Sequence, residues 1–520
     1  MAAKLKSTIT SSFRMHGLSL KSDASKFLVE ALTPVNEVER EDWLDRIIES
    51  VQNQDLTSSM IDQQILESAV QECNADSDEN SSQILNVISA FDVPRYTYSQ
   101  QRKKFIVDTS PPCLHGNADS KALLFKERYS ILYQRTSRHN LFTPVVPGAS
   151  EAQSKKFKLK PVEYLLGSTT KLGDIIVLGM LTQLKEGKYY LEDPTGAVEL
   201  NLSQANFHTG LFTENCFVLA EGWYDDQVFH VNAFGFPPPE PADTTRAYFG
   251  NMNFFGGESA TSLKASIQLK TVEENNEDAM FVFLSDVWLN QLSIRNKLHT
   301  LFTGFMDVPP VAFVFCGNFT STPHGSHHVK RLEESLHELA DLILEFPTIV
   351  EKSYFIFVPG LQDPGPGCIF PRPPIPNCIT EEFQKQIPLS VFTTNPCRIQ
   401  YCTQEIVVFR EDIVNKMCRN CVKFPTSRSE IPANFVKTVV SQAHLCPLPL
   451  HVSPIYWAYD SAMRVYPLPD LIVFADKYDP FTIDSVNCIC TNTGSFSRSD
   501  FSFKVYFPYN KQVEDSKITD

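Results

Sequence analysis

The sequence has no apolar run long enough to cross a membrane. None of its runs approaches the ~18 apolar residues of a spanning helix. The first residues, Met1-Ala-Ala-Lys-Leu-Lys, lack the apolar core of a signal peptide. We therefore expect a soluble, intracellular protein.

Cysteines are not spaced for a disulfide framework or a metal site. The 13 cysteines are an odd number and are scattered, some within apolar runs, as Cys316 is, which favours reduced thiols. Cys418 and Cys421 form a C-x-x-C pair, but no second pair stands at zinc spacing. Gly187-Lys188 lacks the upstream glycine and the hydroxyl residue of a P-loop. We expect no metal and no other cofactor.

Basic residues are too few for a nucleic-acid-binding protein. The net charge is -15, whereas affinity for a polyanion comes mainly from lysine and arginine that neutralise phosphates. Short basic runs such as 101–104 are expected to be solvated surface. We expect contact with DNA to be weak or indirect.

Four short apolar runs in the second half of the chain each end at a group of polar residues. The runs are 280–284, 311–315, 354–358 and 471–474. Such runs are typical of strands buried on both faces. Residues just past the carboxyl ends of these strands are where α/β sheets place their sites. The arrangement resembles that of the binuclear metallo-phosphoesterases.

Most metal ligands of that superfamily are missing here. Active members carry D-x-H, G-D, G-N-H-D and G-H-x-H after the four strands, because two divalent ions need several anionic and imidazole ligands. The corresponding positions are Asp286, Trp288, Asn318, Leu361, Gln362, Asp363, Asp476 and Tyr478. We expect Asp286 and Asp363 to cap turns or accept backbone hydrogen bonds. His444, near the place of a lone histidine ligand, has lost its partners.

Residues 1–75 are predicted to form a small helical domain. Apolar residues recur at helical spacing in three places, around Phe27, around Trp43 and from Ile61 to Val70. The acidic, serine-rich stretch 74–82 is predicted to be a join. It opens a linker region, 76–150, that contains a short helical pattern over 84–91 and a longer one over 125–138.

Residues 151–240 are predicted to form an OB-fold β-barrel. Five short strands with alternating burial, separated by turns such as 192–196, suit such a barrel. Tyr189, Tyr190 and Trp223 could stack on bases, but Glu199 and Glu221 are among several nearby acids. This balance favours a barrel that binds protein or acts as a scaffold. An irregular connector, 241–275, leads to a phosphoesterase-like domain over 276–510.

The whole chain resembles the B subunits of eukaryotic replicative DNA polymerases, and within them the second subunits of DNA polymerase epsilon. The resemblance rests on the domain order and on the runs Leu284-Ser-Asp-Val-Trp-Leu, Asn395-Pro-Cys-Arg-Ile-Gln-Tyr-Cys-Thr-Gln and Pro469-Asp-Leu-Ile-Val-Phe-Ala-Asp-Lys-Tyr-Asp-Pro-Phe. It implies an α+β multidomain fold in which the third domain is a calcineurin-like αββα sandwich with a degenerate metal site.

The resemblance also implies partners and a place in the cell. The barrel and sandwich would bind the zinc-binding C-terminal domain of the catalytic subunit. The N-terminal domain, similar to the C-terminal helical part of AAA+ ATPases, would dock on the GINS portion of the replicative helicase. Other small polymerase epsilon subunits would complete a nuclear assembly. The alternatives are an active phosphodiesterase or 3′-exonuclease, and a single-strand DNA-binding adaptor.

Overall fold

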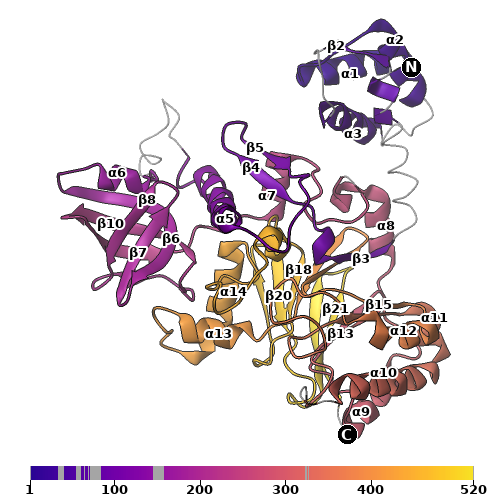
Figure 1. The fold of residues 1–520 in the computed structure, drawn as a ribbon. Coiled ribbons are helices and arrows are strands. Elements are labelled where there is room, and N and C mark those ends of the chain that lie inside the picture. Colours follow the sequence, from indigo (N-terminus) through magenta and orange to yellow (C-terminus); the bar gives the residue numbers. More distant parts are fainter. Residues whose placement is uncertain are drawn as a thin grey trace. The chain divides into compact units, whose positions relative to one another are not determined.

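The computed structural model describes residues 2–32, 40–53, 60–63, 65–67, 69–70, 84–143, 157–259, 261–322, 325 and 327–518. The chain divides into two compact units, Met1–Ile84 and Leu85–Asp520 (Figure 1). Over the described ranges, no helix is both long and apolar enough to span a membrane.

The first unit is helical, as its amphipathic periodicity predicts. It contains the helices α1 (Ala2–Met15), α2 (Ser22–Leu32) and α3 (Arg40–Asn53). Two short strands, β1 (Ser19–Leu20) and β2 (Met60–Ile61), pair in parallel. Phe13, Leu28 and Ile47 are buried in its core. Ile61 was expected in a helix but lies in β2, and α1 was not predicted. The predicted acidic join, 74–82, lies outside the described residues.

The barrel in the second unit has the order β10-β6-β7-β8-β11-β9, with β10 also pairing with β11. Its strands are β6 (Leu172–Lys185), β7 (Lys188–Asp193), β8 (Gly196–Asn201), β9 (Asn206–Phe207), β10 (Phe217–Asp225) and β11 (Val228–Gly235). A short helix, α6 (Val162–Leu166), packs against this barrel, and Val162 and Leu165 are part of its core.

Among the described residues, the rest of the second unit is built on two six-stranded sheets. The first has the order β15-β14-β13-β12-β21-β22, with β12 (Phe281–Ser285), β13 (Ala312–Cys316), β14 (Tyr354–Val358), β15 (Ser390–Phe392), β21 (Ser502–Phe507) and β22 (Gln512–Lys517). The second has the order β19-β20-β18-β17-β16-β3, with β3 (Leu85–Ser89), β16 (Cys397–Tyr401), β17 (Gln404–Phe409), β18 (Leu471–Phe474), β19 (Phe481–Ser485) and β20 (Cys488–Asn492).

The two sheets pack face to face, with helices on their outer faces. One apolar core lies between the sheets and includes Phe283, Val314 and Val473. A second core packs the first sheet against α9 (Leu292–Gly304), α10 (His328–Leu344), α11 (Pro347–Lys352) and α12 (Asn377–Gln386). A third packs the second sheet against α13 (Ile413–Asn420) and α14 (Ile431–Gln442). The four predicted strands are β12, β13, β14 and β18, and all their residues except the partly buried Tyr354 are buried.

Two segments predicted to be helical or irregular have other structures. The helical pattern over 84–91 is wrong, because residues 85–89 form β3, which pairs with β16, and only Ala90–Asp92 is a 3₁₀ turn. The connector 241–275 was predicted to be irregular but contains α7 (Ala242–Phe249) and α8 (Ile267–Asn275).

Residues 96–138 lie against both the barrel and the sandwich. They comprise a hairpin of β4 (Tyr96–Ser99) and β5 (Lys104–Val107) and the long helix α5 (Ala118–Arg138). Phe105 and Leu132 share one apolar core with Met180 of the barrel and Tyr466 of the sandwich. These elements therefore help to hold the second unit together (Figure 1).

The barrel is also fastened directly to the sandwich by buried polar contacts. The Gln442 side-chain amide donates to the carbonyl of Phe217 at 2.7 Å and accepts from the Phe217 backbone N–H at 2.7 Å. The backbone N–H of Leu211 donates to the Thr438 hydroxyl at 2.8 Å. These bonds join the end of α14 to the barrel.

Candidate functional site

The predicted site residues lie at one edge of the sandwich, where the parallel strands end. Asp286 follows β12, Asn318 follows β13, Asp363 follows β14 and Asp476 follows β18. Hydrogen bonds connect Asp286, Asn318 and the backbone of Gln362. The Asp286 carboxylate accepts from the Asn318 backbone N–H at 3.2 Å, and the backbone N–H of Gln362 donates to the Asn318 side-chain oxygen at 3.1 Å.

Arg410, which no sequence motif indicates, lies between the carboxylates of this edge. It follows β17 and is 3% exposed. Its Nη2 donates to Asp286 at 2.8 Å, its Nη1 donates to Asp412 at 3.0 Å, and its Nε donates to the carbonyl of Gly317. Burial alone would lower the pKa of Arg410, but the two carboxylates outweigh it and hold this pKa above its usual value.

Asp412 completes a small network of alternating charge. It accepts from Arg410 and pairs with Lys477, whose Nζ lies 2.8 Å from the second carboxylate oxygen. Although burial opposes ionisation, the two cations lower the pKa of Asp412 to about 2. Asp412 is therefore an anion that is already matched by two protein cations.

Asp363 is held by backbone N–H groups. Phe319 N–H donates to one carboxylate oxygen at 2.8 Å and Gly360 N–H donates to the other at 2.7 Å. Burial raises the pKa of this carboxyl to about 6, although these two bonds favour its charged form. The Asp363 carboxylate also lies so close to Gly317 that a side chain has no space at this position. A Cβ on residue 317 would fall 1.9 Å from the Asp363 oxygen.

Asp476 has a similar environment at the end of β18. Its two oxygens accept from the backbone N–H groups of Val414 and Tyr478, each at 2.8 Å. Burial raises its pKa to about 7. The carboxylate therefore ties the start of α13 to the loop that follows β18.

The side chains at the remaining predicted positions lie in different surroundings. Trp288 is partly buried and its ring lies 5.0 Å from the guanidinium of Arg498. Leu361 and Tyr478 pack on the core beneath α13 and α14, and Gln362 is exposed. The structure thus joins Asp286 to Asn318 by a hydrogen bond. Asp363 bonds instead to the backbone N–H of Phe319, the residue after Asn318. These other side chains make apolar, ring or solvent contacts.

These residues do not fit the binuclear metal centre that the sequence resemblance implies. The carboxylate oxygens of Asp286, Asp363 and Asp476 already accept hydrogen bonds, and a buried guanidinium lies against Asp286. A cation there would repel a divalent ion placed beside the same carboxylate. In the described part of the chain, no group of three or more histidine, cysteine or acidic residues is placed to hold a metal.

His444 lies in a separate buried cluster. Its Nδ1 accepts from the Cys446 backbone N–H at 3.0 Å, and its Nε2 lies 3.2 Å from Asp460, which also accepts from Arg128 of α5. Burial and the nearby Arg128 lower the pKa of His444 to about 4, so the ring is neutral near pH 7. This cluster anchors α5 to the sandwich.

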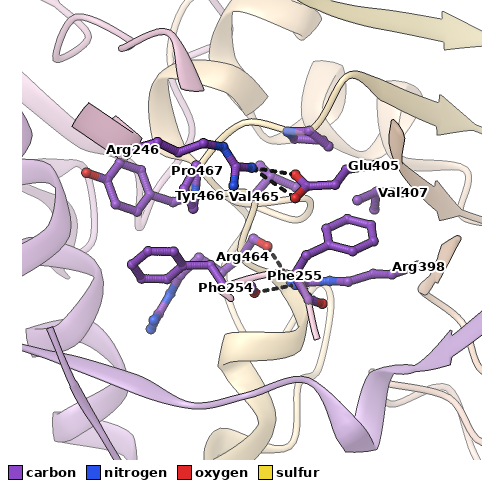
Figure 2. Close-up of a pocket in the computed structure, with 11 residues that line it drawn as sticks. Arg246, Phe254, Phe255, Arg398, Glu405, Val407, Arg464, Val465, Tyr466 and Pro467 are labelled. Atoms are coloured by element: carbon purple, nitrogen blue, oxygen red, sulfur yellow. Dashed lines mark hydrogen bonds and ion pairs between the residues drawn. The ribbon is translucent and has the colours of Figure 1, made fainter. Parts of the chain in front are cut away.

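Three arginines surround a small cavity beside the second sheet (Figure 2). Arg246 makes a two-pronged ion pair with Glu405 at 2.8 and 2.9 Å, and Arg398 donates to the carbonyls of Phe254 and Phe255 at 2.9 Å. Arg464 donates to the carbonyl of Tyr96 at 3.0 Å. The cavity volume of about 10 Å³ suits a single water-sized group, so these arginines fasten the neighbouring segments rather than form a ligand pocket.

Family models cover most of the chain. Residues 1–73 match "DNA polymerases epsilon N terminal", 118–238 match "DNA polymerase epsilon subunit 2-like, OB-fold domain", and 281–483 match the model of the DNA polymerase alpha and epsilon B subunits. Proteins named DNA polymerase epsilon subunit 2 from Bos taurus and Homo sapiens are each 59% identical over 520 residues, covering 99% of both chains. The chain belongs to this family. A Drosophila melanogaster member is 43% identical, covering 99% of this chain and 98% of its own.

The family models confirm the predicted OB-fold domain and match the first unit and the sandwich to the N-terminal and B-subunit domains of the family. The relatives also identify the chain as a second subunit of DNA polymerase epsilon. This polymerase acts in DNA replication. The OB-fold family model begins at residue 118, so it includes α5, which lies in the predicted linker region 76–150.

Proposed function

We propose that this chain is a non-catalytic scaffold of DNA polymerase epsilon. Its sandwich keeps the phosphoesterase framework while the edge where metals would act is held together by protein groups. The observation that carries the proposal is the buried Arg410 guanidinium between Asp286 and Asp412. It supplies inside the fold the positive charge that a metal ion would supply in an active relative.

The loss of hydrolytic activity is tested directly. The purified full-length chain, supplied with manganese and a nucleotide diester, is expected to give no turnover above that of an Asp363→Ala variant. Turnover that disappears in Asp363→Ala would show a working site and reject the proposal. Exonuclease activity on a labelled DNA strand is measured in the same series.

The barrel and sandwich are proposed to bind the zinc-binding C-terminal domain of the catalytic subunit. They are suited to this because Gln442, Thr438 and α5 fasten them into one unit. An obligate interface commonly buries more than ~2,000 Å² and is largely apolar. Residues 85–520 and that domain are therefore expected to co-purify in equal amounts at high salt. Separation at moderate salt would count against an apolar interface.

The helical first unit is proposed to dock the polymerase, in the nucleus, on the GINS part of the replicative helicase. It has its own apolar core and forms a separate compact unit, which suits a tethered module. Other small polymerase epsilon subunits would belong to the same assembly, and contact with DNA would be indirect or weak. Deleting residues 1–84 is expected to spare polymerase assembly and to weaken helicase attachment. The opposite pattern would reject this division of roles.

A further inference from the structure

An open groove lies on the outer side of α13, next to the edge described above. It runs between α13, the start of α14 and the loop after β18, and its volume is about 690 Å³. Asp476 joins two of these parts through its bonds to Val414 and Tyr478. The groove thus borders the loop after β18, at the edge of the sandwich that holds the candidate site.

The groove carries positive charge that the described residues do not balance. Arg419 and Arg428 line it, both are exposed, and neither has an ion pair with any described residue. Two neighbouring lysines, in contrast, have ion-pair partners. Lys416 pairs with Glu411 at 2.9 Å, and Lys477 pairs with Asp412. Asp479 is the acidic residue in the groove lining. Two arginines against one aspartate favour an anionic occupant.

The groove also offers apolar surface. Phe424 in its lining is 51% exposed, although it is a large aromatic side chain on a folded domain. Ile431, which is buried, and Tyr478, which is partly buried, also line the groove. Aromatic side chains and arginines together are the residues that contribute most to protein–protein binding.

We propose that this groove binds an acidic peptide segment of another subunit of the polymerase assembly. An aliphatic or aromatic side chain of that segment packs on Phe424, and carboxylates on either side of it pair with Arg419 and Arg428. The inference rests on the proposed scaffold function and assigns that function a specific surface. A peptide fits better than a nucleic-acid strand, because Asp479 and the net charge of -15 repel a continuous row of phosphates.

The test uses the complete assembly and a double charge reversal, Arg419→Glu with Arg428→Glu. Its matched control is Lys126→Glu with Lys352→Glu, which changes the net charge equally at exposed positions elsewhere. The dissociation constant of the full-length chain for the remaining subunits is measured at 0.1 M salt. The groove variant is expected to bind at least ~10-fold more weakly than the control, with a smaller difference at high salt. Unchanged thermal unfolding of both variants shows that folding is preserved.

A second measurement identifies the occupant. Phe424 is replaced by a photo-cross-linking phenylalanine analogue in the assembled polymerase, and the cross-linked peptide is sequenced by mass spectrometry. An acidic segment of another subunit supports the proposal. Equal binding by groove and control variants, or cross-links to DNA or to a segment without acidic residues, would overturn it. Failure of the wild-type chain to join the other subunits would instead reject the scaffold function itself.

Discussion

At the residue scale, Arg410 distinguishes this edge of the sandwich from a metal centre. A buried ion pair contributes little net stability compared with an apolar pair, but removing one partner leaves the other charge buried and unpaired. Arg410 holds three groups at once, Asp286, Asp412 and the Gly317 carbonyl. Loss of Arg410 should therefore weaken the packing at the ends of β12, β13 and β17.

Replacing Arg410 with methionine is expected to destabilise the second unit by about 3–5 kcal/mol, because Asp286 stays buried without its cation. The double variant Arg410→Met with Asp286→Leu should recover a large part of that loss. Urea unfolding of the four proteins of this double-mutant cycle measures the coupling. Additive effects of the two substitutions would show that the pair is not coupled.

Asp476 should make stability depend on pH. Its folded pKa of about 7 lies above the ~3.9 of an unfolded aspartate, so between these values the folded protein holds a proton that the unfolded chain has released. The free energy of unfolding therefore falls as pH rises through this range. Relative to wild type, Asp476→Asn should gain roughly 3 kcal/mol between pH 5 and pH 8. The exposed Asp225→Asn is the control, and equal pH profiles for all three proteins would contradict this expectation.

His444 should act in the opposite direction. Its folded pKa of about 4 lies below the ~6.5 of an unfolded histidine, so the unfolded chain takes up a proton first as pH falls. Stability is lost from pH ~6.5 down to pH ~4. The variant His444→Gln, followed by urea unfolding across this range, should show a weaker loss at acid pH than wild type. A profile as steep as that of wild type would assign the acid loss to other groups.

At the element scale, the sequence predicted the buried strands well and their polar surroundings poorly. The runs 281–285, 312–316 and 354–358 are apolar on both faces and are therefore strands whatever packs against them. The segment 84–91 has apolar residues at helical spacing, but pairing with β16 across five residue pairs decides its structure. A local pattern cannot reveal a partner strand that is more than 300 residues away.

The candidate site was predicted in part. Asp286, Asn318 and Asp363 could be found because each follows an apolar run. In the structure Asn318 bonds to Asp286, and its neighbour Phe319 bonds to Asp363. Arg410 follows a run of the same kind, 406–409, which was the signal available for it. It was missed because an arginine at a strand end usually indicates solvated surface, and only the fold shows that carboxylates surround this one.

The junction between α14 and the barrel should depend on Gln442. Its amide satisfies both the N–H and the carbonyl of Phe217 in a buried setting. Gln442→Leu leaves both groups without partners, so a loss of roughly 2–4 kcal/mol is expected. Limited proteolysis should then cut between barrel and sandwich sooner than in wild type. The exposed Gln512→Leu serves as the control, and equal cleavage rates would show that the apolar contacts suffice.

At the scale of the whole molecule, the two units should unfold independently. Each has its own core, and residues 1–84 and 85–520 form separate compact units. Calorimetry of the full chain should show two transitions, and removal of residues 1–84 should abolish one and leave the other at the same temperature. A single transition, or a shift of the remaining one by several degrees, would mean that the units stabilise each other.

The position of β3 has a mechanical consequence. It is the first element of the second unit, it comes directly after the first unit in the chain, and it pairs with β16 at the edge of the second sheet. Tension along the chain between the units therefore reaches this strand before any other part of the sandwich. Pulled along its axis, β3 resists in shear with its whole hydrogen-bond ladder, whereas a pull across the sheet opens the bonds in succession. A five-residue strand is thus the first part of the sandwich to bear a load on the connection.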